Sequence, residues 1–157
     1  MNVTMVHPDI DAHSLLAGAQ FIDAFSVTID GTGLDARTAA NRMFGHLPGW
    51  VKGLLALRDL IVRPFGLTTT KQARQISGDR IGMFPVLSET PQQIVAGFDD
   101  SHLDFRAIID VVTAGHGQRV TATTVVLTHN LFGRTYLMII APFHRVIVRS
   151  AMRRVAE

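Results

Sequence analysis

The sequence predicts an α+β domain, in which a curved antiparallel sheet wraps around a long C-terminal helix. Three observations support this fold class. Residues 20–30 alternate like a strand, residues 80–129 read as short strands separated by turn residues, and the last 25 or so residues have a helical apolar period. Two shorter helices are predicted between the first strand and the later strands.

Size and composition limit the classes of protein to consider. A chain of 157 residues is long enough for one domain that buries roughly 68–70% of its unfolded surface. We divide it into an N-terminal extension, residues 1–18, and a single domain, residues 19–157. The chain has no cysteine, which excludes disulfides and thiol chemistry. Asp9 and Asp11, without an apolar segment, argue against a signal peptide, so we expect a cytoplasmic protein.

The first strand and the two helices follow from local signals. One strand face is formed by Phe21, Asp23, Phe25, Val27 and Ile29. Asp35 is placed to cap the first helix, and Gly45 to end it. The second helix is expected to begin near Pro48 and to stop at Pro64 and Gly66. Its predicted apolar stripe is Trp50, Leu54, Leu57 and Ile61.

The later strands are predicted at residues 80–88, 92–99, 102–112 and 119–129, which makes five or six strands in all. Simple hairpins at the intervening turns put the apolar residues of these strands on one face. This face collects Phe84, Val86, Ile94, Ala96, Phe98, Leu103, Phe105, Ala107, Ile109, Ala122, Thr124 and Val126. The opposite face is predicted to be polar and solvated. Residues 68–79 are read as a lid loop or a short edge strand.

A long C-terminal helix over residues 133–156 is expected to cover the apolar face. Its predicted stripe is Tyr136, Ile140, Phe143, Ile147 and Ala151. Arg145, Arg149 and Arg153 are expected to face away, and Pro142 is expected to kink the helix. Because charged residues and Pro142 interrupt the segment, we do not expect it to span a membrane.

Four short motifs carry a resemblance to a known group of proteins. They are Gly-Phe-Asp-Asp at 97–100, His-Leu-Asp-Phe-Arg at 102–106, Thr-His-Asn at 128–130 and Pro-Phe-His-Arg at 142–145. With these motifs the chain resembles an uncharacterised bacterial family of domains of unknown function. Its architecture is similar to the START-like, polyketide-cyclase-like superfamily, which implies the helix-grip fold. The resemblance implies a cavity between sheet and C-terminal helix for a lipid, polyketide or other apolar molecule.

The expected function is therefore the binding of a small hydrophobic or amphipathic ligand, without a cofactor or metal. The candidate ligand-binding residues are Asp23, Phe25, Trp50, Phe84, Phe98, Phe105, Thr124, Val126, Thr128 and Tyr136. A packed core is the alternative for the apolar members of this set. For Asp23, the alternative is an acid at the sheet edge paired with an arginine.

An enzyme is the second possibility, a cofactor-independent cyclase, dehydratase or hydrolase. Its acid–base groups would be Asp23, or the cluster of His102, Asp104 and His129 that the trial register brings together. The same register places that cluster on the outer face of the sheet, which favours a structural role. A metal site at His7, Asp9, Asp11 and His13 matches no known spacing and is not predicted.

The remaining predictions concern partners. Net charge is only +2, and the surface is mixed in sign, so we expect no nucleic acid partner. Arg145, Arg149 and Arg153 allow a weak peripheral contact with a membrane. A domain without a cavity, acting as an interaction or homodimerisation module, is the third possibility.

Overall fold

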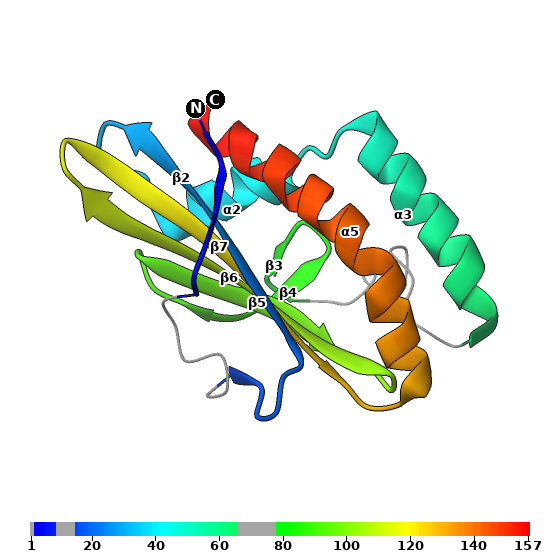
Figure 1. The fold of residues 1–157 in the computed structure, drawn as a ribbon. Helices are drawn as coiled ribbons and strands as arrows, with labels where there is room; N and C mark the ends of the chain where they lie inside the picture. Colours follow the sequence, from blue (N-terminus) through cyan, green and yellow to red (C-terminus); the bar gives the residue numbers. More distant parts are fainter. Residues whose placement is uncertain (1, 9–14, 66–77) are drawn as a thin grey trace.

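A computed structural model describes residues 2–8, 15–65 and 78–157 of the chain, and it confirms the α+β class (Figure 1). The strands are β1 (Thr4–Val6), β2 (Phe21–Asp30), β3 (Arg80–Ile81), β4 (Phe84–Glu89), β5 (Gln93–Asp99), β6 (Leu103–Ala114) and β7 (Gly117–Thr128). The helices are α2 (Ala36–Phe44), α3 (Gly49–Val62) and α5 (Leu131–Arg153), with 3-10 turns η1 (Arg63–Phe65) and η2 (Arg154–Ala156).

The described strands form one antiparallel sheet of seven, in the order β1-β2-β7-β6-β5-β4-β3. The prediction of five or six strands was wrong for two reasons. The extension contributes β1, which pairs with the edge of β2 through Met5 opposite Phe25. The predicted strand 80–88 is divided into β3 and β4 at Gly82, whose φ of 58° requires glycine.

The predicted register of the central strands is confirmed. Val86 lies opposite Ala96, Phe98 opposite Phe105, and Phe105 opposite Val126. All four predicted strands therefore share one apolar inner face, because side chains directly opposite each other point to the same side of a sheet. For β4 this depends on a β-bulge between Val86 and Ser88, which the simple hairpins did not predict.

The predicted cap of α2 is also confirmed. The Asp35 carboxylate accepts a hydrogen bond of 2.7 Å from the backbone N–H of Thr38, and this bond lowers the pKa of Asp35 below its ordinary value. Gly45 is the C-cap, in a right-handed helical conformation. The helix buries Ala36, Ala39, Ala40 and Met43.

One half-buried residue of α2, Arg37, connects this helix to the far edge of the sheet. The Arg37 guanidinium donates to Glu89, the last residue of β4, at 2.7 Å, and to Asp79, just before β3, at 3.0 Å. These bonds raise the pKa of Arg37 and lower the pKa of both carboxyl groups. Because both carboxylates are exposed and Arg37 is only partly buried, salt screens the pairing.

The inner face of the sheet has two differently covered halves. One half is a filled core, where Phe25, Val27 and Val120 pack against α2 and against Met152 and Val155 at the end of the C-terminal helix. The other half, around Phe98, Phe105 and Val126, faces the first part of α5 and the helix α3. In Figure 1, α5 crosses the sheet and α3 runs beside α5.

The outer face of the sheet is less polar than predicted. A second apolar cluster covers part of it, formed by Leu16 of the N-terminal region with Val95, Ile108 and Val125. Thr123, predicted to be solvated, is 1% exposed. The N-terminal extension therefore covers an apolar part of the outer face. The alternation of residues along the strands did not predict that this part differs from the solvated remainder of the face.

The helices α3 and α5 present different faces to the sheet than the sequence predicted. Trp50 and Leu57 are 47% and 53% exposed, while Val51, Leu55 and Arg58 face inward. On α5, Phe143 is 50% exposed, and His144 takes the inward position instead. The predicted stripe of α3 is thus wrong at Trp50 and Leu57. On α5 the prediction is wrong only at Phe143, because Tyr136, Ile140, Ile147 and Ala151 all face inward.

The polar side of α5 carries the three arginines that were predicted to face away from the sheet. Arg145, Arg149 and Arg153 are all exposed, as predicted, and the Arg149 guanidinium also lies 5.4 Å from the ring centroid of the buried Phe25. Pro142 lies inside the helix, as predicted. Among the described residues one helix, Leu131–Ala156, is long and apolar enough to cross a membrane. One such helix is weak evidence for a span, and its inner face packs on the sheet.

Candidate functional site

A cavity of about 220 Å³ lies between the open half of the sheet and the helices α3 and α5. The sheet contributes one wall, with Phe98, Phe105 and Val126 among its residues, and α5 contributes the opposite wall, with Tyr136, Ile140 and His144. Apolar side chains make up most of the lining, as in sites that bind small molecules.

Aromatic rings line the strand wall of the cavity. The Phe84 ring lies 5.2 Å from Phe105 and 6.2 Å from Phe98, and Phe44 of α2 meets Phe84 edge-on at 5.6 Å. Such contacts hold large side chains in fixed orientations. The rings therefore form a preformed surface on which a flat apolar ligand could stack.

Arg58 and Tyr136 provide polar groups in the lining. Nε of Arg58 donates to the Tyr136 hydroxyl at 2.8 Å, and its guanidinium carbon lies 5.7 Å from the Tyr136 ring centroid. Burial acts to lower the pKa of Arg58, but the oxygens of Tyr136 and Asp59 outweigh burial and raise it. Arg58 is therefore a permanent cation at the cavity, with Asp59 paired to it at 2.9 Å.

A second polar pair, Asp23 and His144, lies at the inner face of β2. Asp23 is only 6% exposed, and its Oδ1 lies 3.4 Å from Nε2 of His144. The His144 ring meets Phe21 edge-on at 5.9 Å, and both rings line the cavity. The sequence analysis considered an arginine as the partner of Asp23. The partner in the structure is His144, because α5 crosses β2 at this point.

Six of the ten predicted ligand-binding residues line the cavity: Phe84, Phe98, Phe105, Thr124, Val126 and Tyr136. Four do not. Asp23 lies behind His144, Phe25 is fully buried in the filled core, Trp50 is largely exposed, and Thr128 is buried with an unpartnered hydroxyl among the described residues. The role of all ten in ligand binding stays a prediction.

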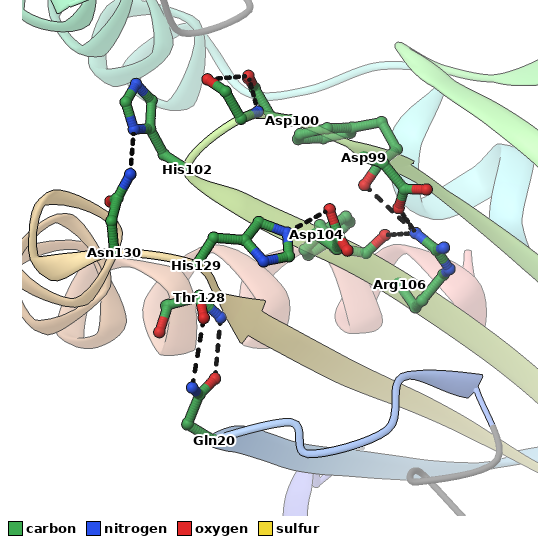
Figure 2. Close-up of polar contacts among 12 residues, drawn as sticks. Gln20, Asp99, Asp100, His102, Asp104, Arg106, Thr128, His129 and Asn130 are labelled. Atoms are coloured by element: carbon green, nitrogen blue, oxygen red, sulfur yellow. Dashed lines mark hydrogen bonds and ion pairs between the residues drawn. The ribbon is translucent and has the colours of Figure 1, made fainter.

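His102, Asp104 and His129, the alternative catalytic cluster, lie in the same region, but the two histidines have different partners (Figure 2). Nε2 of His129 lies 2.9 Å from the Asp104 carboxylate, whereas the His102 ring pairs with the amide of Asn130 at 2.9 Å. None of the three lines the cavity. Figure 2 places them beside the surface pair Arg106–Asp99 and the Gln20 amide, which bonds the backbone of Thr128.

Two predicted features fall where the structure gives no description. Asp9, Asp11 and His13 lie outside the described residues, and so does most of the loop 68–79. Within the described ranges, no group of three His, Asp or Glu side chains is placed to hold a metal ion.

The sequence analysis did not select His144, Arg58, Leu137 or Ala141 as cavity residues. A helical period would have found His144, since it follows Tyr136 and Ile140 at intervals of four residues. Choosing the most apolar neighbour, Phe143, hid that signal.

These features define an α+β domain with an apolar cavity between its sheet and its long C-terminal helix. The family model described as "Protein of unknown function (DUF2867)" matches residues 15–151, so the chain belongs to this family. No curated protein and no solved structure shows significant similarity to the chain.

Proposed function

We propose that this domain is a helix-grip module that binds one small hydrophobic or amphipathic molecule in the cavity. The observation that carries the proposal is the unfilled half of the inner sheet face, with its lining of aromatic and aliphatic side chains. Protein interiors pack to near-crystal density. A hollow at this position, next to a fully packed half, therefore supports a binding role.

The size of the cavity limits the ligand. An apolar cavity of about 150 Å³ holds one benzene ring, and sites for drug-sized molecules reach about 300–1,000 Å³. A cavity of about 220 Å³ suits a substituted ring, a small fused-ring molecule or a short acyl chain. Burial of this surface would drive binding at about 25 cal/mol per Å² of apolar area.

We also propose that the domain works in the cytoplasm and contacts an anionic membrane surface through the outer side of α5. In the middle of this helix, Met138, Ile139, Phe143 and Val146 are exposed by at least half. Arg145, Arg149 and Arg153 are exposed on the same helix. Exposed apolar side chains beside cations favour anionic lipid, and the membrane would be a source of apolar ligand.

The proposed enzyme alternative has weaker support at the cluster of His102, Asp104 and His129. General acid–base groups must reach the reacting atoms of the substrate. Asp104 precedes the cavity residue Phe105 in β6 and so points to the opposite face of the sheet, where His129 pairs with it. His102 lies in the connection before β6 and does not line the cavity.

The binding proposal is tested by filling the cavity. Ala141 of α5 lines it, so Ala141→Leu should occupy part of the space, whereas Ala56→Leu places the same side chain on an exposed position of α3. The wild type and the Ala56→Leu variant should both release a bound molecule in native mass spectrometry, or be stabilised by naphthalene in thermal melting. Ala141→Leu should lose most of either effect.

Absence of any bound molecule, together with no stabilisation of the wild type by naphthalene or by short fatty acids, would contradict the proposal. Equal binding by Ala141→Leu and the wild type would place the ligand elsewhere.

A further inference from the structure

The strongest unexplained feature of the cavity end is a buried acid. Asp23 lies between Phe21 and Phe25 on β2 and is 6% exposed. Burial of a carboxylate in apolar surroundings is costly unless it is paired. Its Oδ1 meets His144 at 3.4 Å, and Oδ2 has no hydrogen-bond partner among the described residues.

His144 connects this acid to the cavity. Its ring lines the cavity together with Ile140 and Ile147, which precede and follow it on the same side of α5. Nε2 is the nitrogen directed at Asp23. A carboxylate acceptor favours the tautomer with the proton on Nε2, so Nδ1 keeps its lone pair.

We infer that His144, oriented by Asp23, is a hydrogen-bond acceptor for a hydroxyl group on the ligand, so that the preferred ligands are phenols, enols or alcohols of small apolar molecules. This inference rests on the proposed binding function. The ligand O–H donates to Nδ1. If the proton moves, the O–H bond breaks, an N–H bond forms at Nδ1, and the resulting imidazolium is stabilised by the Asp23 carboxylate, with no other reactant.

The same pair selects against acids. A ligand carboxylate beside His144 would approach the buried charge of Asp23, and like charges in a poorly solvated site repel strongly. Among the described residues, the other titratable groups that line the cavity are Arg58, Tyr136 and Asp100. Tyr136 precedes His144 by eight residues, about 12 Å along the helix. Arg58 and Tyr136 therefore form a second polar site in the cavity, apart from His144.

The test compares three probes of one shape: naphthalene, 2-naphthol and 2-naphthoate. Titrations with the wild type should give measurable binding of naphthalene and 2-naphthol and the weakest binding of 2-naphthoate. His144→Gln should lower the affinity for 2-naphthol about tenfold, which corresponds to the loss of one hydrogen bond to a charge-paired group. The affinity for naphthalene should fall less than twofold. Gln keeps a donor for Asp23, which limits the loss of stability.

The matched control is His129→Gln, which alters the other described histidine–aspartate pair, on the outer face, and should leave all three affinities unchanged. A spectroscopic readout separates a proton acceptor from a packing role. Excited 2-naphthol transfers its proton to a nearby base and then emits as naphtholate. Bound 2-naphthol should show this emission in the wild type and in His129→Gln, more weakly in Asp23→Asn, and not in His144→Gln.

The outcomes distinguish the two proposals. If naphthalene binds but His144→Gln weakens naphthalene and 2-naphthol equally, or neither, the inference is overturned and the binding function stands. If 2-naphthoate binds best, the assigned ligand class is wrong. If no probe binds the wild type, both proposals fail.

Discussion

Asp35 and Asp23 carry the same functional group in opposite environments. Asp35 is exposed and accepts from a free helix N–H, so its charged form is favoured by a local bond. Asp23 is buried and depends on a histidine 121 residues away in the chain. The first role follows from three neighbouring residues, whereas the second exists only after the sheet and α5 have come together.

The cap gives a stability prediction. Asp35→Ala should lower the free energy of unfolding by about 1 kcal/mol at neutral pH, the usual cost of a lost N-cap. Asp35→Asn keeps an acceptor and should cost less. The measurement is the midpoint of urea unfolding with an unchanged slope. A loss as large for Asn as for Ala would contradict the capping role.

The pH dependence of the cap has a defined sign. The folded pKa of Asp35 lies below its ordinary value of 3.8, so the unfolded chain binds the proton more readily. The contribution of the charge is present above pH 3.8 and disappears as the pH falls through the folded pKa. The difference in stability between the wild type and Asp35→Asn should therefore shrink on acidification over this range.

His144 illustrates why parts of the site were not predictable. At 100° per residue, the observed inner face of α5 is centred about 60° from the predicted one, close to His144. The helix has apolar residues on both sides, so hydrophobicity alone does not fix the rotation. Contacts with β2 fix it, because they pair His144 with Asp23.

The turns and the central strand register were predictable because their causes are local. Short hairpins leave few ways to pair β5, β6 and β7. The helix faces and the strand β1 depend on distant partners. Trp50 and Leu57 of α3 were expected inside for the same reason as Phe143, since this helix also has more apolar positions than its inner face can use.

Docking of α5 depends on one glycine. A Cβ at Gly133 would lie 2.2 Å from the carbonyl oxygen of His102, which is closer than any real contact. The first turn of α5 therefore lies directly against the β5–β6 connection. Asn130 supports the same junction, since its side chain caps Gly133 at 2.9 Å and contacts His102.

Two glycine substitutions in helices should act in opposite directions. Gly133→Ala should destabilise the protein by about 1–3 kcal/mol, because the backbone must shift. Gly53→Ala in α3, where nothing lies within 4 Å of the new Cβ, should stabilise it by about 0.5–1 kcal/mol. Thermal and urea unfolding measure both changes. Equal effects of the two substitutions would refute the contact at His102.

The whole molecule presents two apolar surfaces, the lining of the cavity and the exposed outer side of α5. The second suits a lipid surface or another copy of the chain. The exposed arginines distinguish these partners, because identical positive surfaces repel each other while anionic lipid attracts them.

Vesicle sedimentation tests the membrane proposal. The wild type should sediment with phosphatidylglycerol vesicles and much less with phosphatidylcholine vesicles, and the difference should decrease as salt is raised. Ile139→Glu together with Phe143→Glu should remove binding. Leu87→Glu, at an apolar residue of β4 that is 50% exposed, is the control. A stable dimer in sedimentation velocity, without vesicle binding, would favour homodimerisation instead.

The division of the inner sheet face has a consequence for how the molecule opens. Backbone amides near Val120, in the filled half, should exchange hydrogen only through global unfolding. Amides near Phe98 and Leu103, at the hollow end, should exchange through smaller local openings, because fewer buried contacts must break. A ligand would then slow exchange at the hollow end alone, and hydrogen-exchange mass spectrometry would locate the bound molecule before its chemical identity is known.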